Sequence, residues 1–530
     1  MGSIDWGVLA IYFVIIFGVA IWAGRQERKG GESEDFFLAG RNVGWFVIGA
    51  SLFASNIGSE HLIGLAGTGA SSGVPVAQFE IIAGLVLLLL GWLFVPFYVA
   101  SGVFTMPEFL ERRYSQGSRT YLAVISVAGY ILTKISVTVM AGGLVFETLM
   151  GIDFWTGATV VVVATAIYTV WGGLRAVLYT DLVQMFVLLG GAIAVTWFGL
   201  EAVGGWSELK ASVEPEVFSL WRPMTDPEFP WTGILFGAPI LGVWYWCTDQ
   251  YIVQRVLSAK DQDNARKGTI FAAYLKQLPI FIFVVPGIIA MALANKGMLT
   301  LDEPDQALPA LMGALLPVGI KGLVVAGLLA ALMSSLSSVF NSCSTVFTMD
   351  IYQRIKPQTT DHELKRVGQV ATVIMVVLGM AWIPLMELIS DKLYTYIQSV
   401  QAYISPPIAA VFLIGILWKR ANAQGAIASL MTGLVLGVTR LVLEANKGSL
   451  DGVLLQLASI NFLHVAIFLF LICVAVLVIV SLMTEEPADE KVAGLTMSAR
   501  GAAAVGATVQ AKWASIGVLA VIGVMWIYFS

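Results

Sequence analysis

The chain has 530 residues, of which 58% are hydrophobic and only 12% are charged. Soluble proteins carry about 25% charged residues, so this composition excludes a water-soluble globular protein of comparable length. The formal net charge of −5 says little about partners, and we expect no nucleic-acid partner and no obligate protein partner. The composition instead predicts an all-α integral membrane protein, with the lipid bilayer as its surroundings.

Cysteine and histidine are too scarce to organise a covalent or metal-bound framework. Cys247, Cys343 and Cys473 all lie inside apolar runs, and the chain has only three histidines. This pattern argues against a disulfide scaffold or a zinc site. The sequence also shows no nucleophile–base constellation, so we expect that the protein is not an enzyme and needs no organic cofactor.

Apolar runs long enough to cross a hydrocarbon core of about 30 Å recur along the whole chain. The first run follows Asp5 and precedes Arg25, the reverse of the charge order of a cleavable signal peptide, so we predict a retained helix. We predict about fourteen membrane-spanning helices, at residues 5–24, 44–69, 75–100, 119–150, 152–171, 177–200, 230–256, 267–295, 315–353, 364–386, 392–418, 422–444, 454–483 and 511–529.

Basic residues in the loops predict the orientation of these helices, because Lys and Arg are retained on the cytoplasmic side. An outside N-terminus places 21 of the 30 Lys and Arg residues in or beside cytoplasmic loops. An even number of spans then places both termini outside. We expect a plasma-membrane location. The absence of an Asn-x-Ser/Thr acceptor is consistent with a bacterial inner membrane.

A polar cluster interrupts the second predicted span, in the string Phe53-Ala-Ser-Asn-Ile-Gly-Ser-Glu-His61. Asn56, Gly58 and His61 make a poor continuous helix in lipid, and broken backbone is tolerated at membrane depth only where it lines a cavity. An unwound segment frees carbonyl groups that can coordinate a cation. The alternative is a kink whose polar groups are satisfied by neighbouring helices.

A second cluster consists of hydroxyl residues in the span 315–353. Ser334, Ser337 and Ser338 are three and four residues apart, so they share one helix face. Hydroxyl groups often act only as interhelical contacts in membranes. They are also ligands for a hard cation such as sodium, and Asp181 adds a carboxylate in another span.

Other polar residues lie in predicted spans, where a charged group costs roughly 2.5–3.5 kcal/mol and therefore indicates a pair, a pathway or a site. Lys134 and Asp249 neutralise one another in the simplest interpretation. Tyr245 and Trp246 offer flat apolar faces that suit the C–H face of a sugar ring. Together these residues predict a polar cavity at mid-membrane, and the remaining members of the set are Glu80, Lys276, Gln398 and Gln401.

Six strings of the chain strongly resemble the sodium/solute symporter family, in particular its sodium–glucose cotransporter branch. The resemblance runs from about residue 5 to residue 483. The strings are FASNIGSEHLIGLAGTGA, GWLFVPFY, YTDLVQ, WYWCTDQYIVQR, SSLSSVFNSCSTVFTMDIY and YIQSVQAYISPPIAAVF.

The resemblance implies a single membrane domain with a leucine-transporter-like fold, in which two five-helix repeats are inverted relative to each other. On this expectation the whole chain divides into a leading helix at 5–24, a first repeat at 44–200, a second repeat at 230–418 and C-terminal extra helices at 422–529. The last part includes a cytoplasmic stretch, 484–510, that we expect to be flexible.

The resemblance also implies the sites, residue by residue. The first sodium site would use Ala54, Ile57, Ala331, Ser334 and Ser335, and a possible second sodium site would use Asp181, Ser334, Ser337 and Ser338. Substrate would contact Asn56, His61, Glu80, Lys276, Gln398 and Gln401, and the gates would be Phe79, Tyr245 and Trp246.

The function implied is sodium-coupled symport of a sugar, such as glucose or galactose, by alternating access. Two departures leave the sugar open. Gly242 stands where sugar carriers often have Thr or Asn, and Gln401 stands where a small hydroxyl residue is usual. The alternatives are a carrier of inositol, another polyol or a non-sugar solute, and a solute-gated sensor or channel on the same scaffold.

Overall fold

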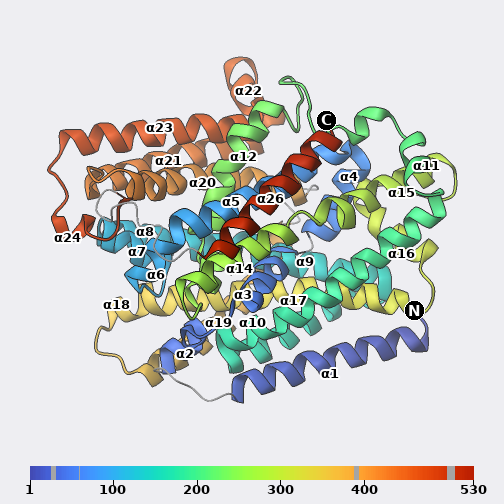
Figure 1. Cartoon of the computed structure of the whole chain (residues 1–530), viewed down its shortest axis with the longest axis horizontal. Coiled ribbons are helices and arrows are strands. Elements are labelled where there is room, and N and C mark those ends of the chain that lie inside the picture. Colours follow the sequence, from blue (N-terminus) through green and yellow to red (C-terminus); the bar gives the residue numbers. More distant parts are fainter. Residues whose placement is uncertain (26–31, 59, 387–392, 498–507) are drawn as a thin grey trace.

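The computed structural model describes residues 1–25, 32–58, 60–386, 393–497 and 508–530. Every regular element in these ranges is a helix, which confirms the predicted all-α class (Figure 1). The α-helices up to mid-chain are α1 (Ser3–Arg25), α2 (Glu32–Leu38), α3 (Trp45–Asn56), α4 (Ala66–Ser72), α5 (Gln78–Leu89), α6 (Val95–Ser101), α7 (Met106–Arg113), α8 (Gln116–Gly129), α9 (Ser136–Val145), α10 (Phe154–Val203), α11 (Trp206–Ala211), α12 (Ala238–Gly242) and α13 (Gln250–Leu257).

The second half of the chain continues in the same way. Its α-helices are α14 (Gln262–Leu275), α15 (Val285–Asn295), α16 (Ala307–Leu315), α17 (Ile320–Val346), α18 (Gln353–Ile355), α19 (Asp361–Met386), α20 (Leu393–Leu417), α21 (Ala423–Ala445), α22 (Gly452–Ser459), α23 (Phe462–Met483), α24 (Asp489–Val492) and α26 (Val509–Tyr528). Short π-helical turns join several of them, among them η2 (Glu60–Leu65), η9 (Val243–Thr248) and η12 (Phe347–Tyr352).

Within the described residues, eleven helices are long and apolar enough to cross a membrane. The longest, α10, is two crossings in one, because Gly173 has a non-helical conformation inside it (φ 59°, ψ −158°). A Cβ at Gly173 would lie 2.5 Å from the Phe36 carbonyl oxygen, so only glycine fits this turn. Two shorter apolar helices, Trp45–Asn56 and Gly233–Thr248, complete the fourteen predicted crossings.

One span that was predicted to be a single helix consists of two helices in the structure. The prediction 454–483 becomes α22 and α23, separated at Ile460 and Asn461. The Asn461 side chain accepts a hydrogen bond from the Leu463 amide and so caps the start of α23. The membrane-crossing part is therefore Phe462–Met483 alone.

Two helices are broken within the fold. The first break was predicted: α3 ends at Asn56, and Ile57 is extended (φ −76°, ψ 102°) before η2 begins. Residue 59 lies outside the described residues. The second break was not predicted: Asp249 is extended (φ −78°, ψ 129°) between η9 and α13. Each break falls in the first helix of one predicted repeat, although the repeat boundaries themselves stay predictions.

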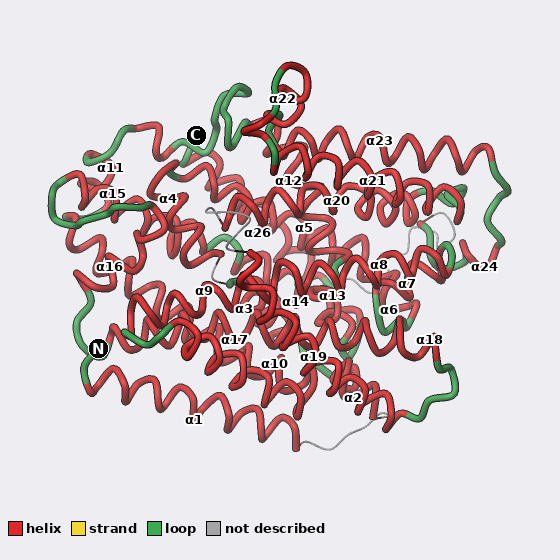
Figure 2. Tube along the Cα trace, turned by 180° about the vertical axis from the view of Figure 1, so that it is seen from behind, coloured by secondary structure: helices red, strands yellow, loops and turns green. Residues whose placement is uncertain are grey.

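Both chain termini lie at the same end of the bundle, which is also the end that carries α11 and α16 (Figures 1 and 2). The Asp5 carboxylate accepts a hydrogen bond from the Gly319 amide, and the Leu220 amide donates to the Phe529 carbonyl. Gly319 lies between α16 and α17, and Leu220 lies between α11 and α12, so segments at this end of the bundle hold both ends of the chain. Helices α18 and α24 lie at the opposite end (Figure 2).

Helix α17 runs through the centre of the molecule, and its residues from Val324 to Val346 are all buried. It packs against α10, α1 and α3. Because α17 carries the predicted serine cluster and α3 carries the predicted break, the fold brings the two sequence features into contact.

Candidate functional site

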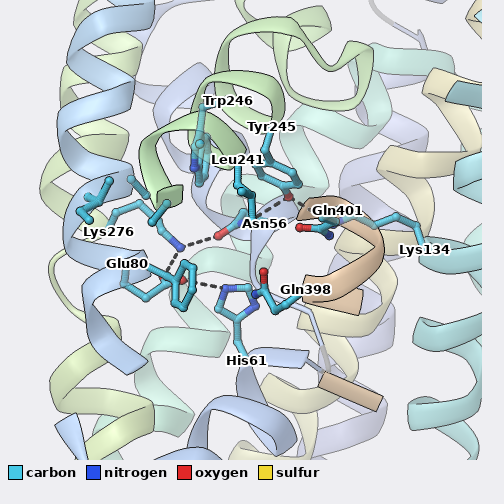
Figure 3. A pocket seen from close by; sticks show the side chains of 15 residues that line it. Asn56, His61, Glu80, Lys134, Leu241, Tyr245, Trp246, Lys276, Gln398 and Gln401 are labelled. Carbon is cyan, nitrogen blue, oxygen red and sulfur yellow. Dashed lines mark hydrogen bonds and ion pairs between the residues drawn. The ribbon is translucent and has the colours of Figure 1, made fainter. Parts of the chain in front are cut away.

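One cavity gathers the residues that were predicted to contact substrate and to gate it (Figure 3). It is lined by Asn56, His61, Phe79, Glu80, Ile82, Ala83, Lys134, Ala238, Leu241, Gly242, Tyr245, Trp246, Lys276, Gln398 and Gln401. All six predicted substrate residues and all three predicted gate residues are in this set. Their roles remain predictions, but their common location is a feature of the structure.

Local chain geometry explains why these side chains converge. Asn56 and His61 lie on either side of the first helix break, and Glu80 lies in the first turn of α5. Lys276 is the residue at which α14 ends. Tyr245 lies in η9, just before the second break. Helix ends and breaks therefore supply most of the polar groups of the cavity, as expected where irregular backbone lines a site at membrane depth.

A continuous polar network connects the buried charges of the cavity (Figure 3). The Lys276 ammonium forms an ion pair with Glu80 and donates to Asn56 Oδ1 at 2.5 Å. His61 Nε2 lies 3.2 Å from the second Glu80 oxygen, Oε1. Asn56 Nδ2 in turn donates to the Tyr245 hydroxyl at 3.0 Å. A solute with several hydroxyl groups offers both donors and acceptors with which to replace these bonds.

Aromatic rings border this network. The Lys276 ammonium lies 5.5 Å from the centroid of the Trp246 ring, and the Tyr245 and Trp246 rings meet edge to face at 5.1 Å. Phe79 contacts Phe229 edge to face at 6.3 Å. The cavity thus combines hydrogen-bonding groups, which suit the hydroxyl-bearing edge of a sugar ring, with flat apolar surfaces, which suit its C–H face.

Lys134 and Asp249, which were predicted to neutralise one another, each contact tyrosine residues in the structure. The Lys134 ammonium lies over the rings of Tyr245 and Tyr251, at 4.6 and 5.0 Å, and donates to the Tyr245 hydroxyl at 3.3 Å. Asp249 accepts hydrogen bonds from the Tyr130 hydroxyl and, at 3.2 Å, from the Tyr251 amide. Asp249 therefore also caps α13, which is how the second break is stabilised.

At the predicted first sodium site, the Ser335 hydroxyl contacts the backbone carbonyls of the first break. Its Oγ lies 3.0 Å from the Ser55 carbonyl oxygen and 3.4 Å from that of Ile57. Ala54 and Ala331 are buried on the same two helices. Hydroxyl and carbonyl oxygens are the donor types that a hard cation prefers. The Ser334 side chain is the exception in this set, because it donates to Asp181 at 2.6 Å.

Asp181, of the possible second site, lies at the centre of a hydroxyl cluster and is fully buried. Its carboxylate accepts from Ser334 at 2.6 Å, from Ser51 at 2.5 Å and from Ser55 at 3.0 Å. Ser338 joins the cluster by donating to the Ser55 hydroxyl at 2.9 Å. The Ser337 hydroxyl instead donates to the Ser334 carbonyl within its own helix, so its bond is not to the carboxylate.

The sequence reading overlooked the buried cation of this cluster, Arg255. Its side chain is fully buried, and Nη2 lies 3.7 Å from Asp181 Oδ2. Ser51, Ser55 and Tyr251 were also overlooked. A signal existed, because Arg255 ends the string WYWCTDQYIVQR and lies inside the predicted span 230–256, where a charge indicates a pair or a site.

Solved structures with the same architecture define the class of fold. A substrate-bound outward-open structure of a sodium-coupled sialic acid symporter aligns with a TM-score of 0.79, at 22% identity, and covers 92% of this chain and 99% of its own. At this identity the likeness shows the fold alone. The chain has the leucine-transporter-type fold with flanking helices, as the family resemblance implied.

Sequence comparison gives the family. Residues 36–433 match the sodium:solute symporter family. The mouse sodium/glucose cotransporter 4 is 40% identical over 534 residues, covering 94% of this chain and 78% of its own. The rabbit sodium/myo-inositol cotransporter 2 is 39% identical over 534 residues, covering 94% and 79%. The chain belongs to the sodium:solute symporter family.

Proposed function

We propose that the protein is a sodium-coupled symporter of a sugar, a hexose such as glucose or galactose, working by alternating access. One observation carries the proposal: a single helix break supplies both the carbonyls that face Ser335 and the Asn56 side chain of the polar cavity. An ion bound at those carbonyls would order the residue that contacts the sugar. The relatives named for sodium and glucose support the same conclusion.

The mechanism requires that sodium bind the two conformations with different affinity, since an ion that does not discriminate between them shifts no equilibrium. Sodium held by the carbonyls near Ala54 and Ile57 and by the Ser334 and Ser335 hydroxyls would tie the break to α17. It would thereby favour the outward-open form and arrange Asn56 and His61 for the sugar. The two gates would then close in turn. Phe79 would close the cavity from the outside, and Tyr245 with Trp246 would close it from the inside.

The free energy available sets the accumulation that one ion can drive. Moving one charge through 100 mV releases about 2.3 kcal/mol. A tenfold sodium gradient adds about 1.4 kcal/mol. One ion therefore supports a sugar ratio near 10³, whereas two ions approach 10⁵. We propose a plasma-membrane location with both termini outside, because this orientation leaves most basic loops in the cytoplasm.

Uptake into proteoliposomes tests the proposal and identifies the solute. An inward sodium gradient should drive accumulation of a labelled hexose above its external concentration, and collapse of the gradient should abolish it. A panel of hexoses, myo-inositol and other polyols should show that a hexose competes best. Sodium current without accumulation would instead indicate a sensor or channel, and preference for myo-inositol would match the rabbit relative.

Ser335→Ala tests the first ion site. The Ser335 hydroxyl lies at the two carbonyls of the break, so its removal should raise the sodium concentration for half-maximal uptake about tenfold while leaving the order of preferred sugars unchanged. Ser344→Ala is the matched control, because this buried serine of the same helix donates only to the Gly368 carbonyl. Equal sodium activation in both variants would remove Ser335 from the site.

A further inference from the structure

Arg255 is a fixed cation enclosed within the hydroxyl cluster of α3, α10 and α17. Its Nε donates to the hydroxyls of Ser51 and Ser55, at 2.9 Å each, and its Nη2 contacts the Ser338 hydroxyl. Its Nη1 donates to the Tyr251 carbonyl. The guanidinium thus lies inside the cluster, where it contacts the same serines that surround Asp181.

Charge balance follows from this arrangement. Asp181 and Arg255 are both fully buried, and Nη2 lies 3.7 Å from Oδ2. One carboxylate and one guanidinium make the cluster neutral. A guanidinium does not lose its proton in proteins, so it cannot become neutral to make room for a second cation. A sodium ion at Asp181 would therefore leave a net buried positive charge unless the guanidinium moves away.

We propose that Arg255 is the built-in competitor for the second cation, and that an ion reaches Asp181 only when the guanidinium withdraws from it. This inference rests on the proposed function and deepens it. Arg255 then sets how weakly the second ion binds, and thereby the sodium concentration above which two ions accompany each sugar. It acts as a positioning residue, because it holds Ser51, Ser55 and Ser338 around the carboxylate.

The position of the guanidinium also connects the two ion sites. Arg255 lies over the Tyr251 ring at 5.4 Å and donates to the Tyr251 carbonyl. The Tyr251 hydroxyl donates to the Ser55 carbonyl, the same oxygen that Ser335 contacts at 3.0 Å. Movement of Arg255 away from Asp181 would therefore shift Tyr251 and, through it, the Ser55 carbonyl that Ser335 contacts at the first site.

Sodium binding to the purified full-length protein in nanodiscs, without sugar, tests the proposal through the change in tryptophan fluorescence. The wild type should show a tighter and a weaker binding step. Arg255→Gln should tighten sodium binding in the weaker step about tenfold. A neighbouring arginine weakens the binding of a proton to a carboxylate by about tenfold to a thousandfold, and we take the lower end of that range for sodium. Arg255→Lys, which keeps a positive charge, should shift it less.

Two further variants make the test specific. Adding Asp181→Asn to Arg255→Gln should abolish the weaker step. Arg113→Gln is the matched control, because Arg113 is also buried but donates to the Gly415 and Trp418 carbonyls, and it should leave both steps unchanged. If Arg255→Gln does not fold, Arg255→Ala prepared with guanidinium ion replaces it, and added guanidinium should then compete with sodium.

The possible results separate this inference from the proposed function. An unchanged weaker step in folded Arg255→Gln, or a tightening that persists without Asp181, would overturn the role of Arg255 and leave symport intact. The role of Arg255 would also be overturned if the wild type shows a single binding step and Arg255→Gln still shows only one. No sodium binding to the wild type at all would refute the proposed function itself.

Discussion

At the scale of single residues, the cavity depends on a buried charge that has more than one partner. Lys276 is 1% exposed and contacts both Glu80 and Asn56, which come from two other helices. Removing one partner of a buried ion pair leaves an uncompensated charge and typically costs about 3–5 kcal/mol. The same contact therefore serves both the stability of the fold and the orientation of the predicted sugar ligands.

Lys276→Met should accordingly lower the melting temperature and raise the sugar concentration for half-maximal uptake at least tenfold. In the double variant Lys276→Met/Glu80→Gln the melting temperature should recover in part, because no buried charge is left unpaired, while uptake stays impaired. Lys296→Met is the control, since its pair with Glu208 is partly exposed to solvent, with side chains 32% and 53% exposed, and surface pairs contribute about 0–1 kcal/mol. Recovery of uptake in the double variant would show that the pair is structural only.

At the scale of helices, the flanking helix α1 holds the start of the helix that carries the serines. Asp5 Oδ1 accepts from the amides of Gly319 and Gly322, at 2.7 and 2.8 Å, and Oδ2 accepts from Gly2 at 2.8 Å. The Gly319 and Gly322 amides lie at the start of α17, where backbone amides have no carbonyl partner within the helix. A carboxylate at this end of a helix is also favoured by the helix dipole. A residue remote from the cavity thereby fixes one end of α17.

Asp5→Ala should destabilise the protein by about 0.5–2 kcal/mol, the usual cost of losing a helix cap. The expected readout is a lower melting temperature in detergent, with the sodium dependence of uptake nearly unchanged. Asp451→Ala provides the comparison, because Asp451 precedes α22 but makes no capping hydrogen bond with its side chain. Equal melting temperatures for the two variants would contradict the capping role.

At the scale of the whole molecule, α17 continues through η12 into α18 and crosses the membrane completely, so its two ends lie on opposite sides of the membrane. The segment Ile320–Ile355 has 36 residues. As a helix it spans about 54 Å, more than the hydrocarbon core of about 30 Å. Its first turn contacts Asp5 near the N-terminus, and the chain leaves its other end at Lys356. Ser3 and Lys356 should therefore face opposite aqueous phases.

Thiol labelling of intact cells measures this arrangement. The three native cysteines are free and buried, so their background reaction should be low. Ser3→Cys and Ser530→Cys should both react with a membrane-impermeant reagent added outside, whereas Lys356→Cys should react only after the membrane is opened. Reaction of all three from one side would contradict the crossing of α17, and the reverse pattern would invert only the predicted orientation.

The sequence by itself determined the class of protein, the fourteen crossings and the first helix break. These features follow from local composition, because apolar length and the cost of polar groups in lipid act on each segment separately. The family resemblance then implied which residues from distant segments gather in the cavity. Asn56 and the serine helix were predictable in this way.

Only the tertiary structure decided which buried groups bond to which. The contacts of Arg255 with Ser51, Asp181 and Ser338 join three other segments, and local pattern carries no information about such pairings. The second break at Asp249 is likewise stabilised by Tyr130 from another helix. Side-chain partners across a helix bundle are determined by packing, because a buried polar group can bond only to the neighbours that the fold places beside it.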